Sequence, residues 1–250
     1  MEDLIERIKE YENSYSYKLT KRLPVVIRLS LRNVSKLTRG LSKPYCPVLM
    51  EIMIKTMCEL CKQIDGAVIA YHQHDEIIII VKNNQTLETD PWLGNDLQKI
   101  VSISASTATY EFNEFLFGDE EPLNLNGKPM FESRVFLVPS YSEAINILIE
   151  RQKKCLNYAI GSATLFELSE KYGYEKASKI VRDSNIRERL DLLMTERNIE
   201  FDKYYNPSFR LGVLCYQEVK ADKLKWFADS DPPIFPNKDA QVFLREIISG

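Results

Sequence analysis

The stretch YHQHDEIIIIV, residues 71–81, decides the fold of this chain. Four consecutive isoleucines and a valine are typical of a buried β-strand, and GAVIAYHQ, residues 66–73, predicts another strand directly before them. The short connection His74-Asp75-Glu76 indicates a hairpin. Carboxylates beside a buried strand need a cation, a metal or hydrogen bonds to stabilise their charge. The stretch therefore raises three alternatives: a metal site, a catalytic pair or a polar turn.

The segments around this hairpin complete a definite order of elements. Apolar patterns predict strands at residues 25–31 and 133–139, and helices at residues 47–64 and 95–116. The order β-α-β-β-α-β is that of a ferredoxin-like, or palm-like, antiparallel sheet of four strands with both helices on one face. The first and third strands are central neighbours in this topology. We therefore expect Ser30 to lie close to Asp75, and the second face of the sheet to be open for a ligand.

The second half of the chain has a different character. From residue 142 onward the pattern is mainly helical, and a single late strand is expected at residues 210–219. We therefore predict an α+β protein in two parts. A palm-like domain preceded by an amphipathic helix occupies residues 1–140, and a mainly helical region in residues 141–250 packs on it.

The composition limits the class of protein. Hydrophobic residues make up 44% of the 250 residues and charged residues 28%, which is an ordinary globular balance. Five irregularly spaced cysteines argue against a disulfide framework and predict a reducing compartment, so we expect a cytoplasmic protein. Cys58 and Cys61 form a C-x-x-C pair inside a helical pattern, which favours buried helix residues over a zinc or redox site. Two histidines in all exclude a three-histidine metal site.

The charge is unevenly distributed. The net charge is −3, yet the segment from Lys18 to Lys43 carries eight basic residues and no acidic one. Such a segment produces a local positive potential that suits phosphate groups. The alternative is a solvated basic face without a ligand. The chain has no glycine-rich phosphate loop and no G-x-S-x-G motif.

Four motifs in order resemble those of one enzyme family. They are VVIRLSLRNVSKLTRGLSKPY (residues 25–45), YHQHDEIIII (71–80), FESRVFLVPS (131–140) and ERQKKCLNYAI (150–160). They are similar to R-x-D-G-R-N-F-H-x-F followed by K-P, Y-G-Q-S-D-E, F-D-G-R-V-x-x-x-P-S and W-R-Q-x-D-C-x-x-N-N of the tRNA-histidine guanylyltransferase family and its tRNA-repair relatives. The resemblance implies a 3′-to-5′ nucleotidyltransferase that adds a nucleotide from a nucleoside triphosphate to the 5′ end of tRNA or a tRNA-like RNA. It also implies Mg²⁺ and a homo-tetramer or dimer.

Several positions depart from the family pattern. Ser30 stands where the family has its first metal-binding Asp, and Leu31 and Ser35 replace a Gly and a His. Cys46 replaces the Asp after K-P, and the hairpin motif has histidines at its Gly and Ser positions. Because hard cations depend on carboxylate oxygens, we expect weaker Mg²⁺ binding than in the family.

The resemblance assigns roles to individual residues. Asp75 would hold the metal with the backbone carbonyl of Leu31 and, weakly, with Ser30, while Glu76 completes the catalytic pair or braces the hairpin. The remaining assignments are the triphosphate ligands Arg32, Asn33, Ser35, Lys43 and His74, and the RNA phosphate ligands Arg28, Arg134 and Arg151.

Other functions stay open at this point. The chain is either a divergent nucleotidyltransferase or a palm that has lost catalysis and serves as a nucleotide- or RNA-binding module. His72 and His74 would project to the same side of a strand and could bind a softer metal with a carboxylate, although stacking or surface residues are favoured. Cys46 with a histidine is a further candidate pair for nucleophilic catalysis.

Overall fold

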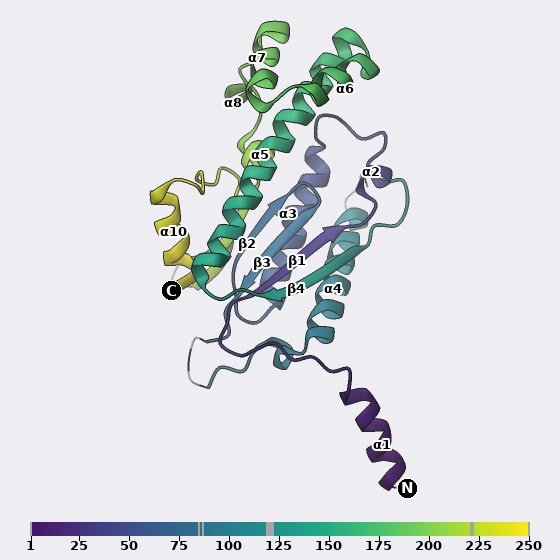
Figure 1. Ribbon diagram of the computed structural model, residues 1–250, viewed down its shortest axis with the longest axis vertical. Helices are drawn as coiled ribbons and strands as arrows, with labels where there is room; N and C mark the ends of the chain where they lie inside the picture. The colour runs from purple at the N-terminus through teal and green to yellow at the C-terminus, as the bar shows by residue number, and fades with distance from the viewer. Residues whose placement is uncertain (1, 85, 87, 119–122, 221–222, 250) are drawn as a thin grey trace.

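A single antiparallel sheet forms the centre of the computed structural model, which describes residues 2–84, 86, 88–118, 123–220 and 223–249 (Figure 1). Its strands lie in the order β4-β1-β3-β2-β5-β6. Their bounds are β1 Val25–Leu31, β2 Ala67–Gln73, β3 Glu76–Val81, β4 Phe131–Leu137, β5 Val213–Lys220 and β6 Lys223–Asp229. The first four strands confirm the predicted palm topology, with β1 and β3 as central neighbours.

Two helices cover one face of the sheet. Helix α3, Pro47–Gln63, and helix α4, Leu97–Gly118, both lie behind the sheet in the view of Figure 1. Alternate residues of β1, such as Val25, Ile27 and Leu29, point into the core that these helices share with the sheet. Both helices therefore lie on one face, as the sequence predicts.

The sequence predicts that the other face of the sheet is open, but the structure shows that much of it is covered. Helix α5, Tyr141–Tyr172, crosses it beside helix α10, Lys238–Ser249. The cover is required because Val26, Ile78 and Ile80 present apolar side chains on this face, and these pack with residues of α5 and α10 in a second core. The part near β4 stays exposed, since Glu132, Arg134 and Phe136 of this strand are exposed.

The C-terminal half adds more to the sheet than the sequence indicates. The predicted late strand is β5, but the structure adds β6, and the two strands extend the sheet beyond β2. The first part of the predicted helical region is one continuous helix of 32 residues, α5, and Gly173 with a φ of 79° follows its last residue. The short helices beyond it are α6 Tyr174–Asp183, α7 Ile186–Arg197, α8 Phe201–Tyr204 and α9 Pro207–Leu211.

The remaining elements are short or peripheral. Helix α1, Glu2–Asn13, projects away from the body of the molecule (Figure 1). Helix α2, Val34–Leu37, follows β1, and a 3-10 turn, η1, spans Trp92–Asn95. Among the described helices, none combines the length and apolar composition that crossing a membrane requires.

Gln152 attaches the C-terminal segment to α5. Its buried amide nitrogen donates to the carbonyl of Pro233 at 3.0 Å, and its amide oxygen accepts from the backbone nitrogen of Phe235 at 2.7 Å. Phe235 is itself fully buried against the second core. One side chain therefore forms hydrogen bonds with two backbone groups of the C-terminal segment.

We predict that Gln152→Leu lowers the free energy of unfolding by about 2–3 kcal/mol, because both backbone groups lose their partner inside the protein. Urea denaturation at neutral pH measures the change. The matched control is Lys153→Leu, one residue along the helix and exposed, which should stay within about 0.5 kcal/mol of the parent. Equal stabilities of the two variants would contradict this role of Gln152.

Candidate functional site

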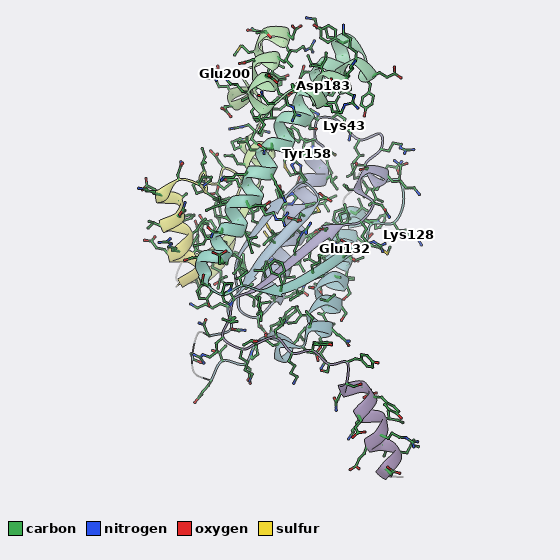
Figure 2. All side chains as sticks on the ribbon, viewed as in Figure 1. Lys43, Lys128, Glu132, Tyr158, Asp183 and Glu200 are labelled. Carbon is green, nitrogen blue, oxygen red and sulfur yellow. The ribbon has the colours of Figure 1, made fainter. Side chains whose placement is uncertain are left out.

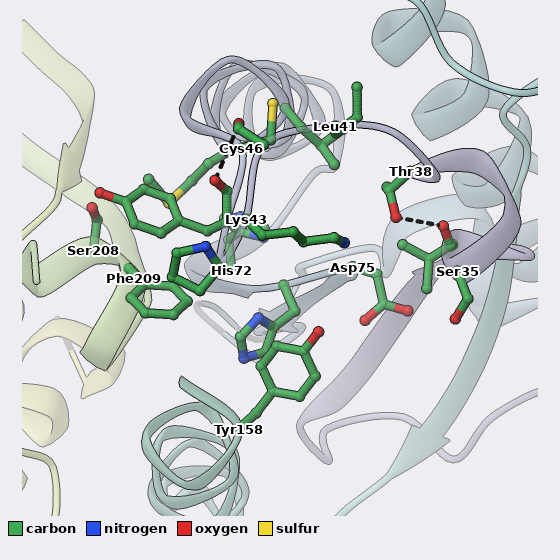
Figure 3. Close-up of a pocket in the computed structure, with 17 residues that line it drawn as sticks. Ser35, Thr38, Leu41, Lys43, Cys46, His72, Asp75, Tyr158, Ser208 and Phe209 are labelled. Carbon is green, nitrogen blue, oxygen red and sulfur yellow. Dashed lines mark hydrogen bonds between the residues drawn. The ribbon is translucent and has the colours of Figure 1, made fainter. Parts of the chain in front are cut away.

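Several of the predicted site residues line one cavity of about 250 Å³. It lies at the end of the β2–β3 hairpin, between the loop after β1, the first turns of α3, helix α5 and helix α9 (Figure 3). The cavity brings together four of the predicted site residues, Ser35, Lys43, His74 and Asp75. Figure 2 shows two of the lining residues, Lys43 and Tyr158, at the junction between the palm and the far end of α5.

Asp75 occupies the turn of the hairpin, and backbone pairing holds it against the end of β1. Ser30 pairs with Glu76 in the antiparallel register, and the backbone nitrogen of Leu31 donates to the carbonyl of Asp75 at 2.8 Å. The predicted approach of Ser30 and Asp75 is therefore confirmed. Asp75 also borders a neighbouring hollow of about 400 Å³, which Leu31 and Asn33 help to line.

The surroundings of Asp75 disfavour the ionised form of its carboxylate. Burial raises its pKa above the ordinary value, and the negative charge of Glu76 raises it further, while backbone hydrogen bonding and Arg28 act in the opposite direction. The hydroxyl group of Tyr158 points toward the same carboxylate (Figure 3). A bound cation would relieve this cost, so Asp75 is suited to holding one.

Glu76 is directed to the opposite side from Asp75. It shares the α5 face of β3 with Ile78, is 6% exposed, and forms an ion pair with Arg28 of β1. Arg151 of α5 lies 3.3 Å from its other carboxylate oxygen. Glu76 thus joins two strands and a helix, which fits the expected bracing of the hairpin, and it does not line the cavity.

The loop after β1 forms the polar wall of the cavity. Asn33 has a left-handed backbone, with φ 56°, and its carbonyl accepts from the backbone nitrogen of Lys36 at 2.9 Å at the start of α2. Ser35 of α2 and Lys43 then face the cavity, and the Lys43–Pro44 peptide bond is cis. The Lys43 side chain extends along the cavity toward Asp75 (Figure 3).

The basic residues are distributed over three places. Arg28 and Arg151 contact Glu76, whereas Arg134 on β4 lies on the surface with its side chain 70% exposed. Arg32 lines a separate hollow beside α4, with Tyr110 among its neighbours. The structure does not bring Arg32 to the cavity that contains Asp75.

The two histidines do not form the side-by-side pair of a regular strand. His74 lies in the turn with φ 50°, and its ring packs on Tyr158 with centroids 3.8 Å apart. His72 is buried on β2, where its Nδ1 lies 3.2 Å from the carbonyl of Glu76. Within the described ranges, no three His, Cys, Asp or Glu side chains are arranged to hold a metal ion. Cys46 and His72 line the same cavity, so their pairing stays a hypothesis.

An aromatic wall of the cavity was not anticipated from the sequence. Phe209 of α9 stacks on Tyr45 with centroids 4.5 Å apart and an interplanar angle of 18°. Tyr158 of α5 covers the hairpin turn. Helical spacing could have indicated Tyr158, because it lies seven residues after Arg151 on the same helix. The distant segment that carries Phe209 has no local signal that relates it to the hairpin.

The donors around Asp75 fit one kind of metal ion. Asp75 is the only carboxylate among the described residues that line the cavity, and the carbonyl of Leu31 and the hydroxyl of Ser35 supply further oxygen atoms nearby. Mg²⁺ is commonly held by one or two carboxylates together with the phosphate oxygens of a substrate. The residues therefore fit a Mg²⁺ ion that arrives with a triphosphate, and not an ion held by protein atoms alone.

Burial determines the charge of His72. Burial lowers its pKa to about 4, although its hydrogen bond to the backbone of Glu76 acts against this shift. An unfolded histidine has a pKa of about 6.5. The folded state therefore binds its proton less readily than the unfolded state between these two values. The contribution of neutral His72 to the free energy of unfolding is therefore fully present above pH 6.5 and is lost as the pH falls toward 4.

We predict that the free energy of unfolding falls between pH 6.5 and pH 5, with His72 contributing up to about 1.4 kcal/mol per pH unit. Urea denaturation at several pH values measures the slope. The variant His72→Gln, which keeps a donor for the carbonyl of Glu76, should show a slope smaller by about this amount. A slope that is unchanged in the variant would show that His72 is not held neutral by burial.

Comparison with known proteins relates this site to a family. A family model described as tRNAHis guanylyltransferase matches residues 5–139. Proteins described as probable tRNA(His) guanylyltransferases from Mus musculus and Homo sapiens are 23% and 25% identical to the chain over 202 residues. Each alignment covers 78% of this chain, and the chain spans 65% of the length of these curated relatives.

Solved structures extend the similarity over nearly the whole chain. A bacterial tRNA(His) guanylyltransferase-like protein in complex with ATP is 29% identical, with a TM-score of 0.84 over 98% of this chain and 99% of that one. A structure of the same description in complex with GTP is 26% identical, with a TM-score of 0.76 over the same shares of both chains. The tRNA(His) guanylyltransferase of Saccharomyces cerevisiae, 19% identical, shares the fold with a TM-score of 0.69 over 87% of this chain and 94% of that one. Because the family model matches more than half of the chain, this protein belongs to the tRNAHis guanylyltransferase family.

Proposed function

We propose that this protein binds a nucleoside triphosphate in the cavity at the hairpin turn and transfers its nucleotide to the 5′ end of tRNA or a tRNA-like RNA. The observation that carries the proposal is the convergence of Asp75, Ser35 and Lys43 on one cavity. The ATP and GTP complexes of similar bacterial proteins support a triphosphate as the ligand. The RNA substrate follows from the description of the family.

Each residue of the cavity has a role in this proposal. Lys43 and the hydroxyl of Ser35 bind the triphosphate, and Asn33 and His74 border it. Asp75 holds Mg²⁺ with the carbonyl of Leu31, while Ser30 gives at most weak assistance in place of a second carboxylate. When bound, Mg²⁺ would neutralise negative charge on the phosphates. Glu76 acts as a positioning residue, since it orients the turn through Arg28 and Arg151.

The RNA would approach along the exposed part of the sheet near β4. Arg134 is exposed there, and Arg28 of the adjacent strand β1 pairs with it in register on the same face. Arg28 and Arg151 both contact Glu76, and Arg151 also lies 3.2 Å from a carboxylate oxygen of Glu150, so the exposed Arg134 is the better placed of these arginines to meet a phosphate. Arg32 in its separate hollow would contact a more distant phosphate. We also propose that the protein forms a dimer or tetramer and is located in the cytoplasm.

A second candidate function is nucleotide or RNA binding without catalysis. The observation that favours it is Ser30, which places a hydroxyl opposite Glu76 where the family motif has a metal-binding Asp. With Asp75 as the single carboxylate of the cavity, a two-metal reaction would lose much of its rate. Incubation of labelled tRNA transcripts with each triphosphate and Mg²⁺ separates the two functions, because only the enzyme extends the 5′ end.

We predict that Asp75→Asn abolishes 5′ extension while it raises the melting temperature by about 2 °C at neutral pH. The rise follows from the raised pKa of Asp75, since the buried ionised form costs free energy that a neutral amide avoids. An extension assay and a thermal melt measure the two effects. Asp65→Asn, at an exposed carboxylate, is the control and should change neither. Full extension by the Asp75 variant would remove this residue from the reaction.

We also predict that Lys43→Ala weakens triphosphate binding by at least about tenfold, because a charge-assisted hydrogen bond contributes about 1.5–3 kcal/mol. Titration calorimetry with a non-hydrolysable triphosphate measures the dissociation constant. Lys21→Ala, an exposed position of the same basic segment, should leave it unchanged. Equal affinities of the two variants would show that the basic segment is only a solvated face.

A further inference from the structure

The outer face of helix α4 carries large apolar side chains along its most exposed line. Ile103, Tyr110 and Phe117 follow one another at intervals of seven residues, and they are 44%, 61% and 69% exposed. Seven residues make nearly two turns of an α-helix, so these side chains form one stripe, here called the α4 stripe. The buried residues of α4 lie on its opposite side, against the sheet. A surface helix ordinarily presents polar residues to solvent, so the α4 stripe indicates a contact with another molecule.

A hollow of about 410 Å³ borders the α4 stripe beside the edge strand β4. Tyr110 forms part of its wall, and Met130, which is 47% exposed, adds a further apolar side chain. Figure 1 shows α4 beside β4, and among the described elements it packs against α3, β1, β4 and η1. None of these elements covers the α4 stripe, as the exposure of its three side chains shows. The stripe and the hollow thus form one continuous surface.

The hollow contains one cation and one anion that are not paired. Arg32 and Glu114 both line it, and within the described part of the chain neither side chain has an ion-pair or hydrogen-bond partner. A molecule that fits this surface must therefore bring an anion for Arg32, a cation for Glu114 and apolar side chains for the α4 stripe. RNA brings only the first of these, and Glu114 would repel its phosphates.

A second copy of this chain brings all three. Two α4 helices that pack antiparallel about a two-fold axis form an isologous contact, in which each residue faces the one equally far on the other side of the axis. With Tyr110 at the axis, Ile103 faces Phe117 of the partner subunit, because both lie seven residues from Tyr110. The two stripes therefore coincide along about 21 Å of helix, at about 1.5 Å per residue.

The same alignment brings the unpaired charges together. Ser106 and Glu114 lie four residues before and after Tyr110, so Glu114 of the partner subunit faces Ser106. Ser106 lines the hollow that contains Arg32. Each subunit thus directs its Glu114 into the hollow of the other, and the symmetry forms the Arg32–Glu114 pair twice. A guanidinium group has five N–H donors, so Arg32 keeps donors for a phosphate.

We propose that two copies of this protein associate through their α4 stripes, with Tyr110 at the two-fold axis and two Arg32–Glu114 pairs between the subunits. The inference rests on the proposed function in one respect, the formation of a dimer or tetramer, and it assigns one contact of that assembly. It also gives the second subunit a role at the cavity. Arg32 directly precedes Asn33, which starts the loop that forms the polar wall, so the Arg32–Glu114 pair anchors this wall from outside.

Sedimentation velocity of the full chain tests the charge pairs. Arg32→Glu and Glu114→Arg each bring like charges together twice, so each variant should have half the mass of the parent assembly. An equimolar mixture of the two variants should regain the parent mass, because one subunit then supplies two acidic groups and the other two basic groups. Lys21→Glu, at an exposed position of the same basic segment, is the control and should keep the parent mass.

These masses need neither nucleotide nor RNA, so they are independent of the proposed nucleotide transfer. A parent that is monomeric would overturn the inference together with the proposed assembly. An oligomeric parent whose mass both variants leave unchanged would overturn the inference alone. Two dissociated variants whose mixture stays dissociated would show that Arg32 and Glu114 do not meet, and would overturn it as well.

Cross-linking tests the alignment. Tyr110→Cys places a thiol beside its own copy at the axis, so a short bismaleimide should join the two subunits by forming one thioether with each thiol. Ile103→Cys and Phe117→Cys should each stay unlinked alone and be linked to each other when they are co-expressed. The parent, with its five cysteines, and Lys179→Cys, at an exposed position of α6, are the controls and should stay unlinked. A stripe covered by RNA or by helix α1 of a second copy would leave Tyr110→Cys unlinked and overturn the inference.

Discussion

The antiparallel pairing of β1 with β3 is the contact on which the rest of the structure depends. It brings the turn of the hairpin to the end of β1, where the backbone nitrogen of Leu31 donates to the carbonyl of Asp75. The four isoleucines of β3 do not specify the register of this pairing, because both faces of the strand are buried and apolar. The register is instead specified by polar residues, since only one alignment places Glu76 against Ser30 and beside Arg28.

Strand geometry also explains why two adjacent carboxylates have different environments. Glu76 is the first residue of β3 and follows its alternation onto the α5 face, where two arginines neutralise it. Asp75 belongs to the turn and faces the cavity, where burial raises its pKa and where none of the described lining residues is an arginine. One carboxylate is thus structural, and the other remains available for a cation. The pairing of β1 with β3 determines the environment of both carboxylates.

The sequence predicts the palm and the approach of Ser30 to Asp75 because these depend on local apolar patterns and on one topology. It does not predict the cover of the second sheet face. The apolar residues of α5 and α10 show that they are buried, but not against which surface. The aromatic wall of the cavity was missed for a similar reason, since Tyr45 and Phe209 meet only through tertiary packing over more than 160 residues. Arg32 follows β1 in the sequence, yet its side chain lines a hollow beside α4.

The protein belongs to the tRNAHis guanylyltransferase family, and we propose that Asp75 supplies the only protein carboxylate that holds a metal ion beside the triphosphate. A crystal structure of the protein with a non-hydrolysable triphosphate and Mn²⁺ would show whether Asp75 holds the metal ion. We expect an anomalous peak within bonding distance of Asp75, with the phosphates beside Lys43 and Ser35. A triphosphate bound elsewhere, or a Mn²⁺ ion bound without Asp75, would contradict it.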